Sequence, residues 1–367
     1  MTIFTEFQGD DGLLPSALPP NFSEAGARPL VLVADDDPAC ILLLEKLLHR
    51  IGCELLYGRD GWEALVLFRL HRPDLVILDI AMPGIDGVGV CQEIKSDPTS
   101  RLTPVILISS SAGSEDHLRG IAAGADDFFA KPINPDRLAA RVRALTDRKA
   151  FTDELEAAET VLFSLALAVE SRDASTAGHC HRLSALASRL GQRLGLEEAE
   201  VRALRRAGML HDIGKVSIPD SILLKAGPLT PAERQVMEQH PLIGERICQP
   251  LRSLRLVLPI IRHHHERIDG LGYPDGLSGE QIPKTALVLQ VVDIYDALTS
   301  NRPYRTAMAP ATALAAMELE TARRRLDPAS FAGLRQMLAE DGPEVYALLS
   351  SASESAAPGS PAADGDG

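Results

Sequence analysis

Side chains able to bind metal ions recur through the second half of the 367-residue chain. His211 and Asp212 are adjacent, in the run MLHDIGK that follows an apolar helical stretch. Neighbours on a helix diverge by about 100°, so one ion need not take both, whereas two ions roughly 3.5–4 Å apart can share them. Further candidate ligands are His179, His240, His264, His265 and Asp293. Any one of these histidines alone would more often be an ordinary core or surface residue, but the whole set predicts a dinuclear metal site, and imidazole with carboxylate favours iron, manganese or zinc over calcium.

The first half of the chain predicts an α/β domain with polar side chains at its strand ends. Residues 29–147 alternate amphipathic helical segments with short apolar strands, expected at Leu30–Ala34, Cys53–Tyr57, Leu75–Leu78, Val105–Ile108 and Asp127–Ala130. This order is typical of a doubly wound, flavodoxin-like fold with a five-stranded parallel sheet, which carries its site at the carboxyl ends of the strands. Those ends hold Asp35, Asp36, Asp79 and Ser109.

The acids at these strand ends suit phosphoryl chemistry. Asp35 and Asp36 could hold Mg²⁺ beside Asp79, whose carboxylate could then attack a phosphoryl group. Lys131 offers a cation to the phosphoryl oxygens, and Ser109 offers a hydroxyl. An acidic cluster by itself is common in solvated loops, so the lysine and the serine carry much of the prediction.

A long helix is expected to connect two domains. Residues 138–169 are helix-compatible throughout, and their apolar residues follow alternating steps of three and four: Phe151, Leu155, Ala158, Leu162, Leu165 and Val169. This pattern predicts a signalling helix that also forms a homodimer through a short coiled coil. The alternative is an amphipathic helix packed on its own domain. Beyond it, residues 170–348 show one helical pattern after another, which predicts an all-α domain.

Composition narrows the class of protein. The apolar runs fall well short of the roughly 18 residues of a membrane span, and residues 1–27 read as a disordered leader without the features of a signal peptide. Residues 350–367 have the composition of a disordered tail. Five scattered cysteines suit a reducing compartment, so we expect a cytoplasmic protein. The net charge of −14 argues against a nucleic-acid duplex as partner, but a small anionic substrate could still bind through metal ions and local cations.

The expected α/β domain, residues 28–147, resembles the receiver domain of response regulators. The resemblance rests on the runs VLVADDDP, DLVILDIAMPGIDG, PVILISS and GADDFFAKP. It implies that Asp79 is the phosphoacceptor and that Asp35, Asp36 and Asp79 bind Mg²⁺. It also implies roles for Ser109 as switch hydroxyl, Phe128 as switch aromatic and Lys131 as the lysine of the site. A cognate sensor histidine kinase would be the partner.

The expected helical domain, residues 155–348, resembles an HD-GYP domain. The matching runs are SRDASTAGHCHR, LHDIGKVSIPDSILLK, QHPLIGERI, HHHERIDGLGYPDGLSGEQIP and DIYDALTSNRPYR. The resemblance implies that two iron or manganese ions are bound by His179, His211, Asp212, His240, His264, His265 and Asp293, with Asp212 as the bridge. Ser175 stands where some three-metal members have a glutamate, and Leu287 stands where an arginine is common.

The same resemblance implies hydrolysis of cyclic di-GMP to pGpG under control of the receiver, and it leaves a second cleavage to GMP open. A phosphodiester is a poor electrophile, and a pair of metal ions activates water and stabilises the charge on the phosphate. Lys215 lies one helical turn after His211, so with Asp212 it is the expected catalytic pair. Phosphorylation of Asp79 is expected to act through the connecting helix.

Further residues match substrate and partner positions of the family. Lys225, Arg302 and Arg305 match contacts to the dinucleotide phosphates, although each could instead form a surface salt bridge. The turn-rich loop of Asp269, Gly270, Gly272, Tyr273 and Pro274 is implied to border the active site. Some relatives use this loop to contact diguanylate cyclase (GGDEF) domains.

Two other functions stay open at this stage. One is a non-catalytic module that senses a cyclic dinucleotide or recruits a cyclase. The other is a phosphodiesterase for a different cyclic dinucleotide, such as 3′,3′-cyclic GMP-AMP, because the motifs do not identify the residues that contact the bases.

Overall fold

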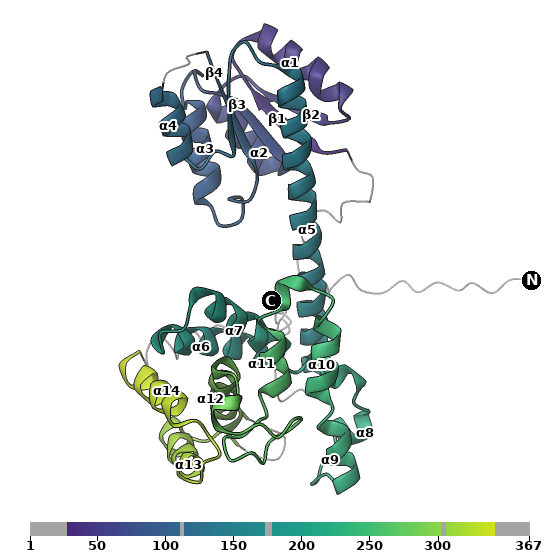
Figure 1. The fold of residues 1–367 in the computed structure, drawn as a ribbon, viewed down its shortest axis with the longest axis vertical. Coiled ribbons are helices and arrows are strands. Elements are labelled where there is room, and N and C mark those ends of the chain that lie inside the picture. Colours follow the sequence, from purple (N-terminus) through teal and green to yellow (C-terminus); the bar gives the residue numbers. More distant parts are fainter. Residues whose placement is uncertain (1–27, 111–113, 173–177, 302–305, 342–367) are drawn as a thin grey trace, which may run out of the picture. The chain divides into compact units, whose positions relative to one another are not determined.

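The computed structural model describes residues 28–110, 114–172, 178–301 and 306–341. The chain divides into two compact units, Met1–Ala157 and Ala158–Gly367. In Figure 1 the strands lie in the first unit, together with helices, whereas the described part of the second unit is built of helices. The predicted leader 1–27 and tail 350–367, together with Ser175, Arg302 and Arg305, lie outside the described residues. No helix among the described residues combines the length and the apolar character that a membrane crossing requires.

A five-stranded parallel sheet forms the first unit, in the order β2-β1-β3-β4-β5. The strands are β1 Leu30–Ala34, β2 Glu54–Gly58, β3 Leu75–Asp79, β4 Val105–Ser109 and β5 Asp127–Ala130. This confirms the predicted doubly wound α/β fold. Every residue of β3 and β4 is buried, as expected for central parallel strands covered on both faces. Asp79 and Ser109 are the last residues of these strands, so both lie at the carboxyl edge of the sheet.

Helices cover both faces of this sheet. They are α1 Pro38–Arg50, α2 Gly61–His71, α3 Gly87–Ser96, α4 Ser114–Ala122 and α5 Pro135–Ser171. Asp37, Asp60 and Asp86 accept backbone N–H groups at the starts of α1, α2 and α3, which satisfies donors that a helix leaves unpaired. Val31 and Val33 pack in the core beneath α1 and α5, whereas Leu32 and Ala34 pack in the core beneath α2 and α3.

The helix α5 is 37 residues long and extends the predicted 138–169 helix at both ends. Proline suits its first position, because an N-terminal N–H has no partner within the helix. Leu138, Val142 and Leu145 belong to a core of the first unit, and Ala166 belongs to the core of the second. Of the predicted dimer seam, Phe151 is exposed, as is Leu165, so this part of the seam stays available for the predicted pairing.

The described part of the second unit is helical, with only one isolated bridge, between Asp269 and Ser278. Its elements are α6 His179–Arg193, α7 Glu198–Leu210, η2 Ile213–Ser217, α8 Asp220–Leu223, α9 Pro231–Met237, α10 His240–Cys248, η3 Arg252–Leu254, α11 Leu258–His263, η4 Gly279–Gln281, α12 Lys284–Thr299, α13 Pro310–Ala322 and α14 Pro328–Glu340. The predicted all-α domain is therefore confirmed.

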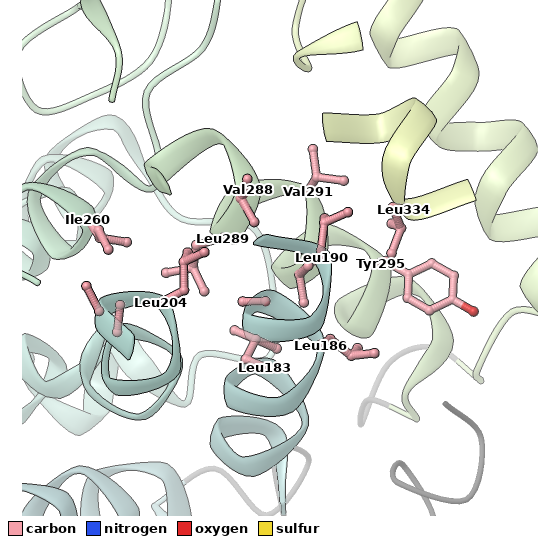
Figure 2. Packing of buried hydrophobic residues seen from close by; sticks show 14 of the residues in the cluster. Leu183, Leu186, Leu190, Leu204, Ile260, Val288, Leu289, Val291, Tyr295 and Leu334 are labelled. Atoms are coloured by element: carbon pink, nitrogen blue, oxygen red, sulfur yellow. The ribbon is translucent and has the colours of Figure 1, made fainter. Parts of the chain in front are cut away.

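One apolar core holds these helices together. Figure 2 shows side chains from five helices converging: Leu183, Leu186 and Leu190 of α6, Leu204 of α7, Ile260 of α11, Val288, Leu289, Val291 and Tyr295 of α12, and Leu334 of α14. Gly208 allows α7 to approach α6 closely, since a Cβ there would lie 2.4 Å from the backbone nitrogen of Ser184. This packing brings together the ends of helices that carry the predicted metal ligands.

Candidate metal centre and receiver site

The seven predicted metal ligands lie in two groups. Ligand atoms of the first group lie within 4.8 Å of one another, and so do those of the second. The first group is Asp212, His240, His264 and His265, and the second is His179, His211 and Asp293. Their positions at the start of α6, the end of α7, the start of α10, the end of α11 and the middle of α12 explain why residues so far apart in sequence meet.

Asp212 joins the two groups. Its Oδ1 lies 3.2 Å from His240 Nε2 in one group, and its Oδ2 lies 3.3 Å from His211 Nε2 in the other. The adjacent residues His211 and Asp212 thus turn to different groups, as their divergence on a helix requires. A carboxylate with one oxygen facing each group has the geometry of a bridge between two ions.

Backbone carbonyls orient three of the histidine rings. The Nδ1 atoms of His211, His240 and His264 lie 3.2, 2.8 and 2.7 Å from the carbonyl oxygens three residues earlier in the chain. A carbonyl only accepts, so each Nδ1 donates to it, and in the neutral form of the ring this leaves the lone pair on Nε2. The Nε2 atoms of His240 and His264 are 3.5 Å apart. Two facing lone pairs repel each other unless a cation lies between them, so these residues fit a metal ion.

Asp296, which the motifs did not single out, orients the fourth histidine, His179. Its Oδ2 lies 2.7 Å from His179 Nδ1, and its Oδ1 accepts from Arg182 Nε at 2.6 Å. Burial raises the pKa of Asp296, but the hydrogen bonds from His179 and Arg182 outweigh this and lower it to about 2. Asp296 follows Asp293 by three residues, and Arg182 follows His179 by three. That helical spacing was the available signal.

The pKa shifts of His264, His265 and Asp212 suit metal binding. Burial lowers the pKa of His211, but the Asp212 carboxylate raises it overall in the metal-free protein. Burial lowers the pKa of His264 and of His265 well below the usual range, and the neighbouring histidines lower them further. Burial raises the pKa of Asp212, but Lys215 and His211 overcome this and hold it well below the usual range. Neutral imidazoles and an ionised carboxylate are the forms that bind metal ions.

Lys215 lies beside the carboxylate of Asp212, with its Nζ 2.5 Å from Asp212 Oδ2. Both residues border a cavity that His179 also lines, together with apolar side chains that include Ala166 and Val169. The lysine can therefore act on a group that enters this cavity next to the metal ligands.

Lys225 forms a surface ion pair, which was the alternative to its predicted contact with the substrate. Its Nζ lies 2.6 Å from Glu233 Oε2, and Glu233 also accepts the backbone N–H of Thr230 at the start of α9. Of the predicted phosphate contacts, Lys225 alone falls within the described residues.

The predicted loop of residues 269–274 borders the first metal group. The ring of Tyr273 lies 4.8 Å from that of His265, tilted by 33°. Gly272 has no room for a side chain, since a Cβ would lie 2.4 Å from the nitrogen of Arg267, and Gly270 adopts a φ of +76°. The fully buried Glu266, which the sequence analysis also missed, accepts N–H groups of Asp275 and Leu277 and so shapes the loop.

Leu287, which stands where the family commonly has an arginine, is packed inside the protein. It forms a small apolar cluster with Ile282 and Ala286, against which Ile268 and Leu277 are packed. The leucine therefore supports both ends of the loop segment, where a buried arginine would need a partner for its charge.

The receiver acids gather as expected at the edge of the sheet. Ligand oxygens of Asp35, Asp36 and Asp79 lie within 4.8 Å of one another. Lys131 Nζ lies 2.6 Å from Asp79 Oδ1 and 2.9 Å from Asp35 Oδ2. Burial lowers the pKa of Lys131, but these two carboxylates raise it above its ordinary value. A permanently charged lysine beside Asp79 suits a site that receives a phosphoryl group.

The two predicted switch residues lie near this edge but contact other residues. Ser109 Oγ donates to Asp116 Oδ2 at 3.3 Å. The half-buried ring of Phe128 meets the ring of His117 edge-on, with centroids 4.8 Å apart. Ser109 also accepts the backbone N–H of Lys131 through its carbonyl, at 2.8 Å, so the serine and the lysine are directly linked.

Comparison with known proteins accounts for both units. Residues 31–143 match the response regulator receiver domain, and residues 163–330 match the HD domain. The cyclic di-GMP phosphodiesterase response regulator RpfG of Xanthomonas campestris is 37% identical over 317 residues, which cover 80% of this chain and 84% of the relative. The chain belongs to this family of response regulators. Its HD domain makes this response regulator a metal-dependent hydrolase.

Two further relatives bear on the substrate. A cyclic di-GMP phosphodiesterase of Thermotoga maritima is 34% identical to this response regulator over 303 residues, 75% of this chain and 81% of the relative. The 3′3′-cGAMP-specific phosphodiesterase 3 of Vibrio cholerae is 36% identical over 180 residues, 49% of this chain and 39% of the relative. The match to the second relative covers less than half of either chain.

Proposed function

We propose that this response regulator hydrolyses cyclic di-GMP to pGpG, and then to GMP, in an HD-GYP domain of residues 155–348 that a receiver domain of residues 28–147 controls. The observation that carries the proposal is the division of the ligands into two groups that share the two oxygens of Asp212. The substrate is proposed from relatives that match three quarters or more of this chain, among them the proteins of Xanthomonas campestris and Thermotoga maritima.

The proposed ligands of two iron or manganese ions are His179, His211, Asp212, His240, His264, His265 and Asp293. Bound divalent ions of this kind lower the pKa of water and offset the charge that develops on a phosphate during hydrolysis. Asp296 holds His179 in register, and the carbonyl acceptors hold the other rings. The ammonium group of Lys215 offers positive charge to the phosphate or to the leaving oxygen, beside Asp212. For Lys225 to bind a substrate phosphate together with Arg302 and Arg305, it must exchange its ion pair with Glu233.

In the receiver we propose that Asp79 accepts a phosphoryl group from a sensor histidine kinase, with Mg²⁺ held by Asp35, Asp36 and Asp79. Lys131 already lies against Asp79 and can stabilise the phosphoryl oxygens. Ser109 and Phe128 then change partners. The connecting helix transmits the change, and its exposed Phe151 and Leu165 serve the proposed homodimer.

Two proposals concern location and partners. All five cysteines are free and buried, which supports a reducing compartment, the cytoplasm. The loop that contains Tyr273 is proposed to contact a GGDEF domain, and Leu271 at 74% exposure offers an apolar contact there.

The test is metal analysis combined with product identification. Protein loaded with Fe²⁺ or Mn²⁺ under reducing conditions should hold two ions per chain and convert cyclic di-GMP to pGpG. Fully loaded protein that leaves cyclic di-GMP intact would instead indicate a sensor or recruiting module. Competition with 3′,3′-cyclic GMP-AMP at equal concentration tests the alternative substrate, and turnover with and without beryllofluoride on the receiver tests control by Asp79.

A further inference from the structure

The last turn of α5 and the residue that follows it contact two segments that carry proposed active-site residues. Glu170 Oε1 accepts the backbone N–H of His179 at 2.6 Å, and that of Cys180 at 3.4 Å. Two residues later, Arg172 Nη1 donates to the carbonyl of Lys215 at 3.0 Å, and Arg172 Nη2 donates to the carbonyl of Ile218 at 2.9 Å. Neither contact reaches a metal group directly, because each acts on the backbone that supports it.

Glu170 completes the start of α6. The residue before this helix is Gly178, which has a φ of +73° and no side chain to cap the helix. The first N–H groups of a helix have no partner within it, and the helix dipole favours an anion there. Glu170 provides that anion from another helix. The N–H that it binds at 2.6 Å belongs to His179, the ligand whose ring Asp296 orients.

Arg172 completes the end of η2, a five-residue 3-10 helix. The last carbonyls of a helix also lack internal partners, and a cation suits them. The guanidinium fork donates to the carbonyl of Lys215, which also accepts the backbone N–H of Ile218, and to the carbonyl of Ile218, the residue that follows η2. Its Nη2 also lies 2.5 Å from Asp220 Oδ1, which fixes the fork from its other side. One of the two carbonyls belongs to Lys215. The position of the ammonium group beside Asp212 therefore depends on this contact.

We propose that Glu170 and Arg172 are positioning residues, here called the α5 clamp, which hold His179 at the metal centre and Lys215 at the phosphate. The role of Lys215 rests on the proposed function. A 3-10 helix has poorer hydrogen-bond geometry than an α-helix, so η2 needs an external anchor. A misplacement of about 1 Å can cost on the order of 100-fold in rate. Because Glu170 lies in the last turn of α5 and Arg172 directly follows the helix, a movement of α5 changes the metal ligand and the lysine together.

The two halves of the clamp predict different defects. Glu170→Ala should weaken binding of one Mn²⁺ by about 10- to 100-fold, the range typical of groups that orient ligands. Glu170→Gln retains an acceptor oxygen and should recover most of that affinity. Arg172→Ala should bind two Mn²⁺ ions as the parent does, but its kcat should fall by about 10- to 100-fold, and Arg172→Lys should be intermediate because an ammonium group cannot fork to two carbonyls.

The matched control is Arg206→Ala. Arg206 is another arginine that forms an ion pair in this part of the protein: its Nε lies 3.1 Å from Oε2 of Glu159, a residue of α5. The side chain of Arg206 is 37% exposed, against 29% for that of Arg172. It holds neither of the two segments, so the control should keep parent metal affinity and parent kcat.

The experiment titrates full-length protein with Mn²⁺ by calorimetry and measures hydrolysis of cyclic di-GMP and of bis-p-nitrophenyl phosphate. Parent Mn²⁺ affinity in Glu170→Ala, or parent kcat in Arg172→Ala, overturns the corresponding half of the proposal. Equal losses in Arg206→Ala overturn both, because they would indicate general destabilisation. If Glu170→Ala does not fold, Glu170→Asp takes its place, because its shorter carboxylate should also weaken Mn²⁺ binding, and parent affinity would overturn the proposal. Mn²⁺ binding and the model diester report on the clamp even if cyclic di-GMP is not the substrate.

Discussion

Substitution of Gly214 tests whether close contact between two backbones assembles the metal centre. Gly214 lies in η2, two residues after Asp212, and packs against the start of α10. A Cβ at this position would lie 2.0 Å from the carbonyl oxygen of His240 and 2.6 Å from the nitrogen of Gly244. Real Cβ atoms essentially never approach closer than 3.0 Å, so Gly214→Ala must separate the segments by at least 1.0 Å. Both obstacles are backbone atoms, which cannot rotate out of the way.

That displacement acts directly on the bridge between the groups. Asp212 Oδ1 and His240 Nε2 are 3.2 Å apart across this contact. Metal–ligand distances tolerate deviations of only about 0.2 Å, so a shift of 1.0 Å should cost at least one ion and about 100-fold in turnover. Overpacking of this kind also lowers the free energy of unfolding, by about 1–3 kcal/mol.

Gly244→Ala is the matched control, because it faces the same contact from α10. Its nearest neighbour would be Ile261 Cγ2 at 3.0 Å, a methyl group that can yield by a few tenths of an ångström. The assay measures metal per chain, turnover of cyclic di-GMP, and urea unfolding with and without a chelator. Two tightly bound ions and parent turnover in Gly214→Ala would refute the reasoning, as would an equal loss in Gly244→Ala.

Two further substitutions test the bridging role of Asp212 and the contribution of the Asp275 carboxylate to stability. Asp212→Asn keeps the shape of the side chain but provides one neutral oxygen in place of two anionic ones. Metal content should therefore fall below two ions per chain, and turnover should fall by more than about 100-fold. Elemental analysis that shows two retained ions would contradict the bridging role. Hydrogen bonds from Arg262 lower the pKa of Asp275 to about 2 from its usual 3.8, although burial opposes this. Because the folded-state pKa is the lower one, Asp275 contributes stability above pH 3.8 that is lost as the pH falls toward 2. In metal-free protein, the difference in unfolding free energy between parent and Asp275→Asn should therefore shrink over that interval, and a difference independent of pH would show that the ion pair does not stabilise the fold.

Local patterns in the chain were sufficient for the element order and for the candidate ligands. Alternating apolar strands and amphipathic helices predicted the receiver sheet to within a residue or so at each strand end, because strand and helix periods depend on neighbouring residues. The HD pair, the other histidines and the DGLGYP loop could likewise be recognised, because each is a short run of neighbouring residues. The divergence of adjacent helical residues even indicated that two ions, rather than one, could share His211 and Asp212.

Which of these residues meet was decided by the packing of helices far apart in the chain. His179 and Asp296 are separated by 117 residues, and their pairing exists only because α6 packs on α12. Whether Lys225 faces substrate or Glu233 depends likewise on how the segment after α8 lies against α9. The clamp of Glu170 and Arg172 has no signature of its own, because its partners are backbone groups, which every residue type carries. Close contacts at Gly208 and Gly214 set these distances, and they depend on the complete core rather than on any local run of residues.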